Sequence, residues 1–271
     1  PYVKVEDGTE GEGSFMLTTI QMGKANIFTY SLAQWIDYWG IYKEEEIRQE
    51  NESDEEYEMR QLYLMEGSKE KAIISAFETA GKPYEVTYAG IYIYRVVEGK
   101  PADGILETGD RITAVDGKEL ESSSQFTDYV TNKHIGDTIQ VHFRRGKDNM
   151  TEEIQIEKIK ETGKPGIGIV LTDDIDVDSN PDVEIDSESI GGPSAGLMFS
   201  LEIYNQLVEE DLTDGKDIAG TGTIDEEGKV GPIGGIDQKV VAADKSGAAV
   251  FFAPNENGAE DSNYKVAVET A

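Results

Sequence analysis

Hydrophobic and polar positions in the first third of the chain predict one strand and two helices. Residues 13–20 are rich in β-prone side chains and follow a Gly- and Glu-rich lead, which predicts a strand. Aromatic and aliphatic side chains over residues 32–42 favour a helix, and residues 57–80 have helical spacing that ends at a Gly-Lys-Pro sequence. Residues 43–58 hold nine acidic side chains against two basic ones, the composition of a solvated connector.

The pattern changes to short strands and turns between residues 84 and 159. A long β-prone stretch over residues 86–97 is broken at Gly90, which divides the predicted strand. Residues 111–115 predict a further strand, which ends in a hairpin turn at Asp116-Gly117. This region is therefore expected to be mainly β.

A helix and one more strand complete the middle region. Ser122 and Gln125 form a capping-box pattern that opens a helix through about residue 132, and residues 138–144 alternate as a strand. The rest of the chain alternates strands with two helices. Within it, residues 171–190 carry eight carboxylates and no Lys or Arg, which indicates an exposed strand or a long loop.

Composition limits the classes of function. A length of 271 residues is two domains of ordinary size or one large one. The 24 basic and 55 acidic side chains give a net charge of −31, which argues strongly against binding nucleic acid or anionic membrane surfaces. The absence of Cys removes disulfides, thiolate nucleophiles and Cys-ligated metals. The sequence has neither a bilayer-crossing apolar run nor a signal segment.

One glycine-rich turn places a serine at the start of a helix. Residues 191–196 read Gly-Gly-Pro-Ser-Ala-Gly, and apolar side chains then follow at helical spacing. Because proline favours the first helical position, we expect the cap at Gly192, Pro193 first in the helix and Ser194 inside the first turn. The hydroxyl of Ser194 would then lie beside free backbone N–H groups, as in an oxyanion hole. The alternatives are a purely structural helix start and a phosphate site.

A second glycine turn leads into a helix that carries a lysine on its apolar side. Within residues 236–245, Lys239 shares a face with Ile236 and Ala243, and the neighbouring carboxylate of Asp237 points elsewhere. Burial lowers the pKa of such an amine and makes it a base, which a serine needs before it attacks a carbonyl. The alternative is a lysine that snorkels to solvent.

Other catalytic templates are missing from the sequence. There is no P-loop, no zinc-protease His-Glu-x-x-His, no calcium loop and no Gly-x-Ser-x-Gly elbow. The two histidines, His134 and His142, are too few for a metal cluster and lie in the strand-rich middle region. We therefore expect no metal and no cofactor.

The glycine turns resemble the ordered signatures of the Lon peptidase domain. Three segments carry the resemblance: Gly192-Pro193-Ser194-Ala195-Gly196, Gly220-Thr221-Gly222-Thr223-Ile224, and residues 228–239, Gly-Lys-Val-Gly-Pro-Ile-Gly-Gly-Ile-Asp-Gln-Lys. The resemblance implies a Ser–Lys dyad with Ser194 as nucleophile and Lys239 as general base. It also implies supporting roles for Gly192 and Pro193, and Thr221 matches a threonine that lies beside the lysine in the family.

The middle region resembles a PDZ domain. The matching residues are Ala89-Gly90-Ile91-Tyr92 for the carboxylate-binding loop, then 101–102, 109–112 and 115–117 in the usual order. The resemblance implies that loop N–H groups hold the terminal carboxylate of a peptide, which adds as a strand beside Ile91 and Ile93. Phe126 and Val130 would form the opposite wall. The alternative is an inert PDZ-like spacer.

Together the two resemblances are those of the PDZ-Lon peptidases of Gram-positive bacteria. They imply an α+β fold: a Lon proteolytic domain of the ribosomal protein S5 domain 2-like type with an inserted, mainly β PDZ domain. The implied parts are residues 1–81 of the Lon domain with its acidic connector, the PDZ domain at 82–160, and the rest of the Lon domain, with the dyad, at 161–271. Family members have one N-terminal membrane helix, absent from this sequence, and an extracytoplasmic catalytic part.

The implied function is that of an ATP-independent serine endopeptidase. Its substrates would be secreted or membrane-associated peptides and small proteins. The PDZ domain would recruit these substrates or gate their access. The resemblance also allows an oligomer. Two alternative functions are also compatible with the sequence. One is a PDZ-type peptide-binding module on an idle Lon-like scaffold; the other is a small-molecule kinase with its phosphate site at residues 191–196. The acidic run before Gly191 and the missing Mg-nucleotide motif count against the kinase.

Overall fold

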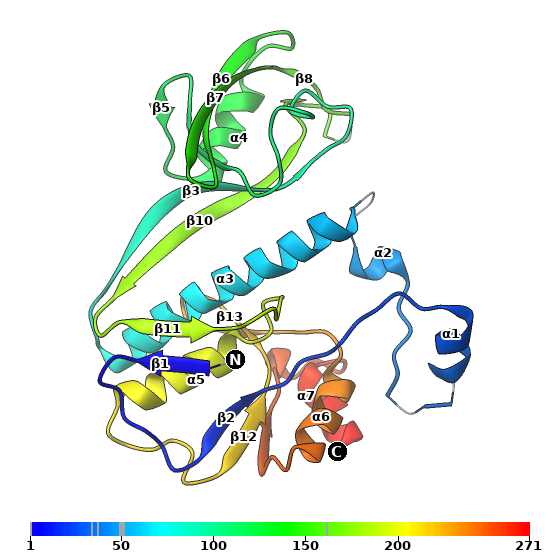
Figure 1. Ribbon diagram of the computed structural model, residues 1–271, viewed down its shortest axis with the longest axis vertical. Coiled ribbons are helices and arrows are strands. Elements are labelled where there is room, and N and C mark those ends of the chain that lie inside the picture. The colour runs from blue at the N-terminus through cyan, green and yellow to red at the C-terminus, as the bar shows by residue number, and fades with distance from the viewer. Residues whose placement is uncertain (1, 34, 37, 49–51, 161) are drawn as a thin grey trace. The chain divides into compact units, whose positions relative to one another are not determined.

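The chain folds into two units. The computed structural model describes residues 2–33, 35–36, 38–48, 52–160 and 162–271 (Figure 1). The first unit comprises Pro1–Glu52, Gln61–Glu85 and Val177–Ala271, and the second comprises Ser53–Arg60 and Val86–Asp176. The second unit is thus inserted in the first along the sequence, and it extends beyond the 82–160 expected for the PDZ domain. The mixture of helices and strands confirms the α+β class.

The first unit combines helices with small sheets. Its elements are β1 (Tyr2–Val5), β2 (Ser14–Leu17), α1 (Ile27–Ala33), α2 (Glu44–Ile47), most of α3 (Asp54–Ala80), β11 (Val183–Asp186), α5 (Gly196–Leu207), β12 (Asp217–Gly220), β13 (Thr223–Ile224), β14 (Val230–Gly231), α6 (Ile236–Lys245), β15 (Val250–Phe252), a 3₁₀ turn at Glu256–Gly258 and α7 (Asn263–Thr270). β12 is the middle strand of a parallel sheet, between β15 and β2. Buried side chains of α3 and α5 form the core, among them Phe77 and Ile203.

The helix α3 begins earlier than predicted because a capping box starts it. Ser53 accepts the N–H of Glu56 at 3.1 Å, and the Glu56 side chain accepts the N–H of Ser53 at 2.8 Å. The Gly-Lys-Pro sequence ends the helix at Ala80, as predicted. The strand predicted at residues 13–20 is confirmed over the shorter range of β2.

The helix predicted over residues 32–42 is wrong. Helix α1 ends at Ala33, and Tyr38 has φ +67°, which is incompatible with a helix. None of the side chains of α1 is buried, and Trp35 is 87% exposed. Helices in proteins are stabilised mainly by burying an apolar face, which this segment does not do. None of the helices within the described residues combines the length and apolarity that crossing a membrane requires.

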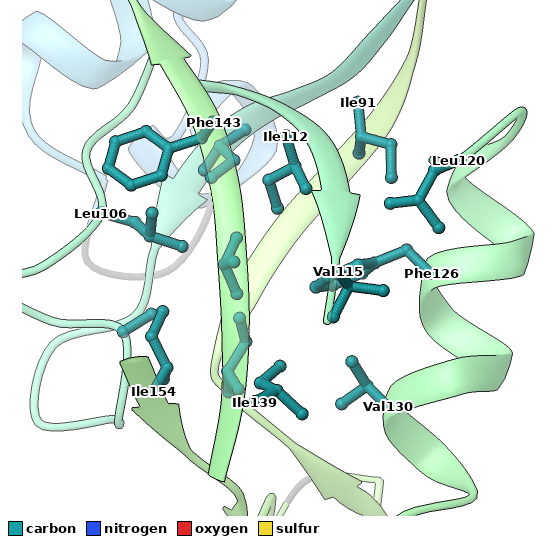
Figure 2. Packing of buried hydrophobic residues seen from close by; sticks show 14 of the residues in the cluster. Ile91, Leu106, Ile112, Val115, Leu120, Phe126, Val130, Ile139, Phe143 and Ile154 are labelled. Carbon is teal, nitrogen blue, oxygen red and sulfur yellow. The ribbon is translucent and has the colours of Figure 1, made fainter. Parts of the chain in front are cut away.

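The second unit is built on a mainly antiparallel sheet. Its elements are β3 (Tyr84–Val96), β4 (Arg111–Val115), β5 (Lys118–Glu119), α4 (Ser123–Thr131), β6 (Thr138–Arg145), β7 (Asp148–Gln155), β8 (Glu157–Lys158), β9 (Pro165–Gly166) and β10 (Ile169–Ser179), where β3 and β10 continue into the first unit. The strand order is β10-β3-β4-β6-β7, with β5 paired to β4. Figure 2 shows its core, where Phe126 and Val130 of α4 face Val115 of β4 and Ile139 of β6.

Local sequence signals in this unit are confirmed, with one exception. The turn at Asp116-Gly117 joins β4 to β5, and Ser122 caps α4 by accepting the N–H of Gln125 at 3.2 Å. The exception is the break predicted at Gly90, because β3 runs through it without interruption. Gly90 has φ +132°, and a Cβ there would lie 2.9 Å from the carbonyl oxygen of Ile112. The glycine thus permits close approach of β4 instead of ending the strand.

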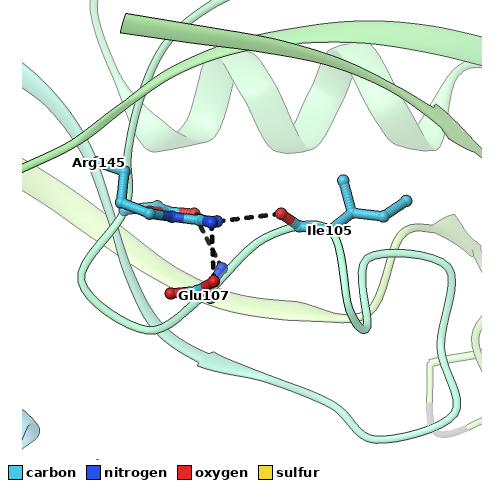
Figure 3. A network of polar contacts seen from close by, with 4 residues as sticks. Ile105, Glu107 and Arg145 are labelled. Carbon is cyan, nitrogen blue, oxygen red and sulfur yellow. Dashed lines mark hydrogen bonds and ion pairs between the residues drawn. The ribbon is translucent and has the colours of Figure 1, made fainter. Parts of the chain in front are cut away.

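A buried ion pair ties the end of β6 to the turn before β4. Arg145 binds Asp110 through Nε at 2.8 Å and through a second nitrogen at 2.7 Å, and it also binds Glu107 and the Ile105 carbonyl (Figure 3). Asp110 is 1% exposed, and its Oδ2 also accepts the N–H of Glu107 at 2.8 Å. The hydrogen bonds from the guanidinium to Asp110 raise the pKa of Arg145. The pair therefore holds the loop over residues 98–110.

We expect Arg145→Met to destabilise the second unit by about 3 kcal/mol, because it leaves the carboxylate of Asp110 buried without its partner. Calorimetric unfolding of the whole chain measures the shift of that unit's transition. Arg144→Met is the matched control, since it removes a neighbouring arginine with no ion pair among the described residues. An equal loss in both variants would contradict the assigned role.

Candidate active site

The nucleophile candidate lies before α5, not inside it. Helix α5 begins at Gly196, and Ala195 is its N-cap. The predicted helix start at Pro193 is therefore wrong. The carbonyl of Ser194 accepts the N–H of Gly222 at 3.0 Å, so it is directed to a neighbouring segment and not along the helix. Ser194 consequently lies in the turn, at the N-terminal end of α5.

Lys239 reaches this serine from the first turn of α6. Its Nζ lies 2.8 Å from the Oγ of Ser194, and the lysine is only 3% exposed. The N-cap of helix α6 is Gly235, whose φ of +66° lies in the left-handed region that favours glycine. The structure thus excludes a snorkelling lysine and brings the predicted pair together.

Burial prepares the amine of Lys239 for base chemistry. Desolvation lowers the pKa of Lys239 to about 8, and no nearby carboxylate contributes to the shift. This matters because the chain as a whole is strongly acidic, and a carboxylate beside the amine would raise its pKa. A fraction of Lys239 is therefore neutral near pH 7 and able to accept a proton.

Thr221 completes the contacts around the amine. It follows β12 directly and is fully buried. Its Oγ1 accepts from Nζ of Lys239 at 2.9 Å and donates to the carbonyl of Ser194 at 3.1 Å. One hydroxyl thus orients both the amine and the backbone of the serine, in the place that the family resemblance implied.

The supporting residues Gly192 and Pro193 are held by α3. Gly192, at φ +88°, donates its N–H to the carbonyl of Gln61 at 2.8 Å, and the carbonyl of Pro193 accepts the hydroxyl of Ser68 at 3.1 Å. Sequence reasoning missed Gln61 and Ser68, because they lie more than a hundred residues earlier in the chain. The one feature of the sequence that could have indicated Ser68 is its place as a small polar residue on the buried face of α3.

The predicted peptide-binding residues of the PDZ region do not form a groove beside β3. Ala89, Gly90, Ile91 and Tyr92 lie within β3, not in a loop. β3 is paired with β4 on one edge and with β10 on the other, so a peptide cannot add beside it without displacing a strand. The side chains in question belong to the core, with Ile91 and Ile93 fully buried, Phe126 2% exposed and Val130 4% exposed.

The edge that remains is that of β10. Within the described residues, β10 is the end strand of the sheet. Ser123, the first residue of α4, donates its N–H to the carboxylate of Asp173, so α4 lies beside β10. Ile169 and Leu171 of β10 pack against the same core as the buried side chains of α4. Gly168, at φ +80°, precedes the strand, and β10 forms the first part of residues 171–190, for which an exposed strand or a long loop was expected.

Two family models match the chain. The PDZ domain model matches residues 65–157, and the model of the Lon protease (S16) C-terminal proteolytic domain matches residues 181–266. The second match contains Ser194, Thr221 and Lys239. The PDZ domain of the SdrC-like protein from Listeria monocytogenes is a similar solved structure: it is 40% identical, covers 32% of this chain and 92% of that chain, and gives a TM-score of 0.31.

Curated relatives are Lon proteases. The chain is 42% identical over 66 residues to the mitochondrial Lon protease homolog of Caenorhabditis elegans and to the Lon protease of Dictyoglomus thermophilum. Each stretch covers 24% of this chain, and 7% or 8% of the relative, so the chain spans a small part of those proteins. The chain therefore contains one region similar to a PDZ domain and one region similar to the proteolytic domain of Lon proteases of family S16.

Proposed function

We propose that the chain is an ATP-independent serine endopeptidase that uses Ser194 and Lys239 as a catalytic dyad. The observation that carries the proposal is the 2.8 Å contact between Nζ of a buried lysine and the serine Oγ. A purely structural lysine would have a carboxylate partner or reach solvent, and this one has hydroxyl partners.

The neutral amine accepts the hydroxyl proton as Oγ attacks the scissile carbonyl. The tetrahedral oxyanion forms near the N-terminal end of α5, where the helix dipole favours negative charge. The protonated lysine then gives its proton to the leaving amine, and an acyl-enzyme remains. In the second half, Lys239 takes a proton from water as the water oxygen attacks the ester carbonyl, and it returns that proton to Oγ of Ser194 as the acid product leaves. Thr221 keeps the amine directed at the serine in both halves.

Digestion of unstructured peptides in the absence of ATP tests this proposal. Mass spectrometry of the products identifies internal cleavage. Cleavage that requires ATP would contradict the proposed ATP independence, and no cleavage at all would favour the rival in which the PDZ domain binds peptides on a catalytically idle scaffold.

We also propose that the complete protein is anchored by an N-terminal membrane helix and acts on the outer side of a Gram-positive cell membrane, on secreted or membrane-associated substrates. The resemblance to PDZ-Lon peptidases supports this placement. Labelling of the full-length protein on intact cells by a membrane-impermeant reagent tests it.

We further propose that the PDZ domain recruits substrates through peptide addition to the free edge of β10. Thr127 lies one turn after Ser123 on α4 and therefore on the side of α4 that touches β10. Thr127→Trp is expected to lower kcat/KM for long substrates about 5-fold or more, with short peptides unaffected, because the indole fills the space beside the strand. Asp128→Trp, on another face of α4, is the matched control. If both variants showed the same preference between long and short substrates, the free edge of β10 would not be the site of recruitment.

A further inference from the structure

The hydroxyl of Ser68 bonds to a group outside its own helix, which is unusual for a serine in the middle of a helix. A hydroxyl inside a helix commonly bonds to the carbonyl three or four residues earlier, as Thr79 of α3 does with Ser75 at 2.7 Å. Ser68 donates instead to the carbonyl of Pro193, which immediately precedes the nucleophile. Ser68 is 4% exposed, and a Cβ on Gly196 would lie 2.8 Å from its Oγ, so helix and turn are in close contact.

The hydrogen bond from Ser68 at 3.1 Å, together with a longer one from the N–H of Gly196 at 3.4 Å, fixes one of the two peptide planes that flank Ser194. In a trans peptide the C=O and the N–H point in opposite directions. A Pro193 carbonyl held against α3 therefore turns the N–H of Ser194 away from that helix. The second plane is fixed at the carbonyl of Ser194, by Gly222 at 3.0 Å and Thr221 at 3.1 Å. Freeing either plane lets Oγ rotate relative to Lys239.

We infer that Ser68 is a positioning residue for the nucleophile, because its hydroxyl fixes the Pro193–Ser194 peptide and thereby the place of the serine Oγ against Lys239. The inference rests on the proposed dyad. Ser68 touches neither the substrate nor the reacting atoms. Its loss should therefore lower kcat and leave KM unchanged, since misplacement of a reacting group by about 1 Å costs up to about 100-fold in rate.

The test compares four variants of the complete chain in peptide hydrolysis. Ser68→Ala is expected to lower kcat about 10-fold at unchanged KM and unchanged pH midpoint. Ser68→Thr and Ser68→Val have the same shape and differ only in the hydroxyl, so a higher kcat of the threonine variant isolates the hydrogen bond from any steric effect. Ser75→Ala is the matched control: Ser75 is another buried serine of α3, and it bonds to Ser200 at 3.3 Å, away from the turn.

Several results would overturn the positioning role while the dyad stands. They are a kcat of Ser68→Ala within twofold of the unchanged chain, equal kcat values for the threonine and valine variants, and an equal loss of kcat in Ser75→Ala. Thermal stability of each variant is measured alongside, because a merely structural serine would lower stability in both alanine variants and kcat in neither. If the unchanged chain has no activity, the proposed function itself fails.

Discussion

Replacing Ser194 with alanine is expected to abolish peptide hydrolysis and leave the fold intact. The hydroxyl is the nucleophile, so its loss should lower kcat by about 10⁴-fold or more. The fold should persist because Ala195, not Ser194, is the N-cap of α5, and because the backbone contacts of Ser194 with Gly222 do not involve its side chain. Peptide digestion measures the activity, and circular dichroism measures the helix content.

Ser200→Ala provides the matched control for this variant. Ser200 is a buried serine on α5, and its hydroxyl bonds to Ser75, outside the dyad. We expect it to retain activity. Near-normal turnover by Ser194→Ala would contradict the nucleophile assignment, and so would a loss of its helical signal.

Lys239→Met and Lys239→Arg are expected to be inactive for different reasons. Methionine keeps much of the side-chain stem but has no amine. The guanidinium of arginine stays protonated at any accessible pH and cannot accept the proton of Ser194. Hydrolysis by either variant at more than a trace of the normal rate would exclude the lysine as the base.

The pH dependence follows from the same lysine. Burial lowers the pKa of Lys239 from 10.5 to about 8, so the rate should rise with pH and level off above about 8. The shift of the pKa corresponds to an unfavourable environment for the charge of about 3 kcal/mol. Below pH 8 the buried, protonated lysine destabilises the folded chain by this full amount. Between pH 8 and 10.5 the folded chain has lost a proton that the unfolded chain still holds, so the stability of the folded chain rises with pH.

Lys239→Met should therefore be as stable as the unchanged chain at pH 7, or more stable, because it removes a disfavoured buried charge. Thermal unfolding at pH 7 measures this effect. A rate that is flat from mildly acidic to mildly alkaline pH, with chemistry limiting, would contradict the mechanism. So would a large loss of stability in the methionine variant at neutral pH.

Local signals in the sequence predict the elements that depend on local interactions. The cap at Ser122, the hairpin at Asp116-Gly117 and the end of α3 involve residues within one turn of each other, and all three are confirmed. The meeting of Ser194 and Lys239 required more, namely ordered glycine segments whose resemblance to a family supplies the tertiary arrangement.

Features that depend on contacts between residues far apart in the sequence could not be predicted from local sequence signals. The start of α5 depends on Gly222, which lies outside that helix. The helix predicted over residues 32–42 does not form because the apolar side chains of the described residues in this segment are not buried against the rest of the protein. The free edge in the second unit depends on strand order, because β10 is the last strand of this unit in the chain and pairs with β3, the first. The contact of Ser68 with Pro193 joins segments that carry no common sequence pattern.

The pairing of β3 with β10 has a consequence for how such a chain can diversify. The two strands stay together along their length: Val97 donates to Gly168 at 2.8 Å near one end, and Asn180 donates to Pro83 at 3.3 Å near the other. Because neighbouring strands lie about 5 Å apart, the points where the chain enters β3 and leaves β10 are close together, as at the stem of a hairpin. Lengthening what such a stem encloses costs little closure entropy. Segments of other lengths are therefore expected to be accepted between β3 and β10 without changes in the segments that carry Ser194 and Lys239.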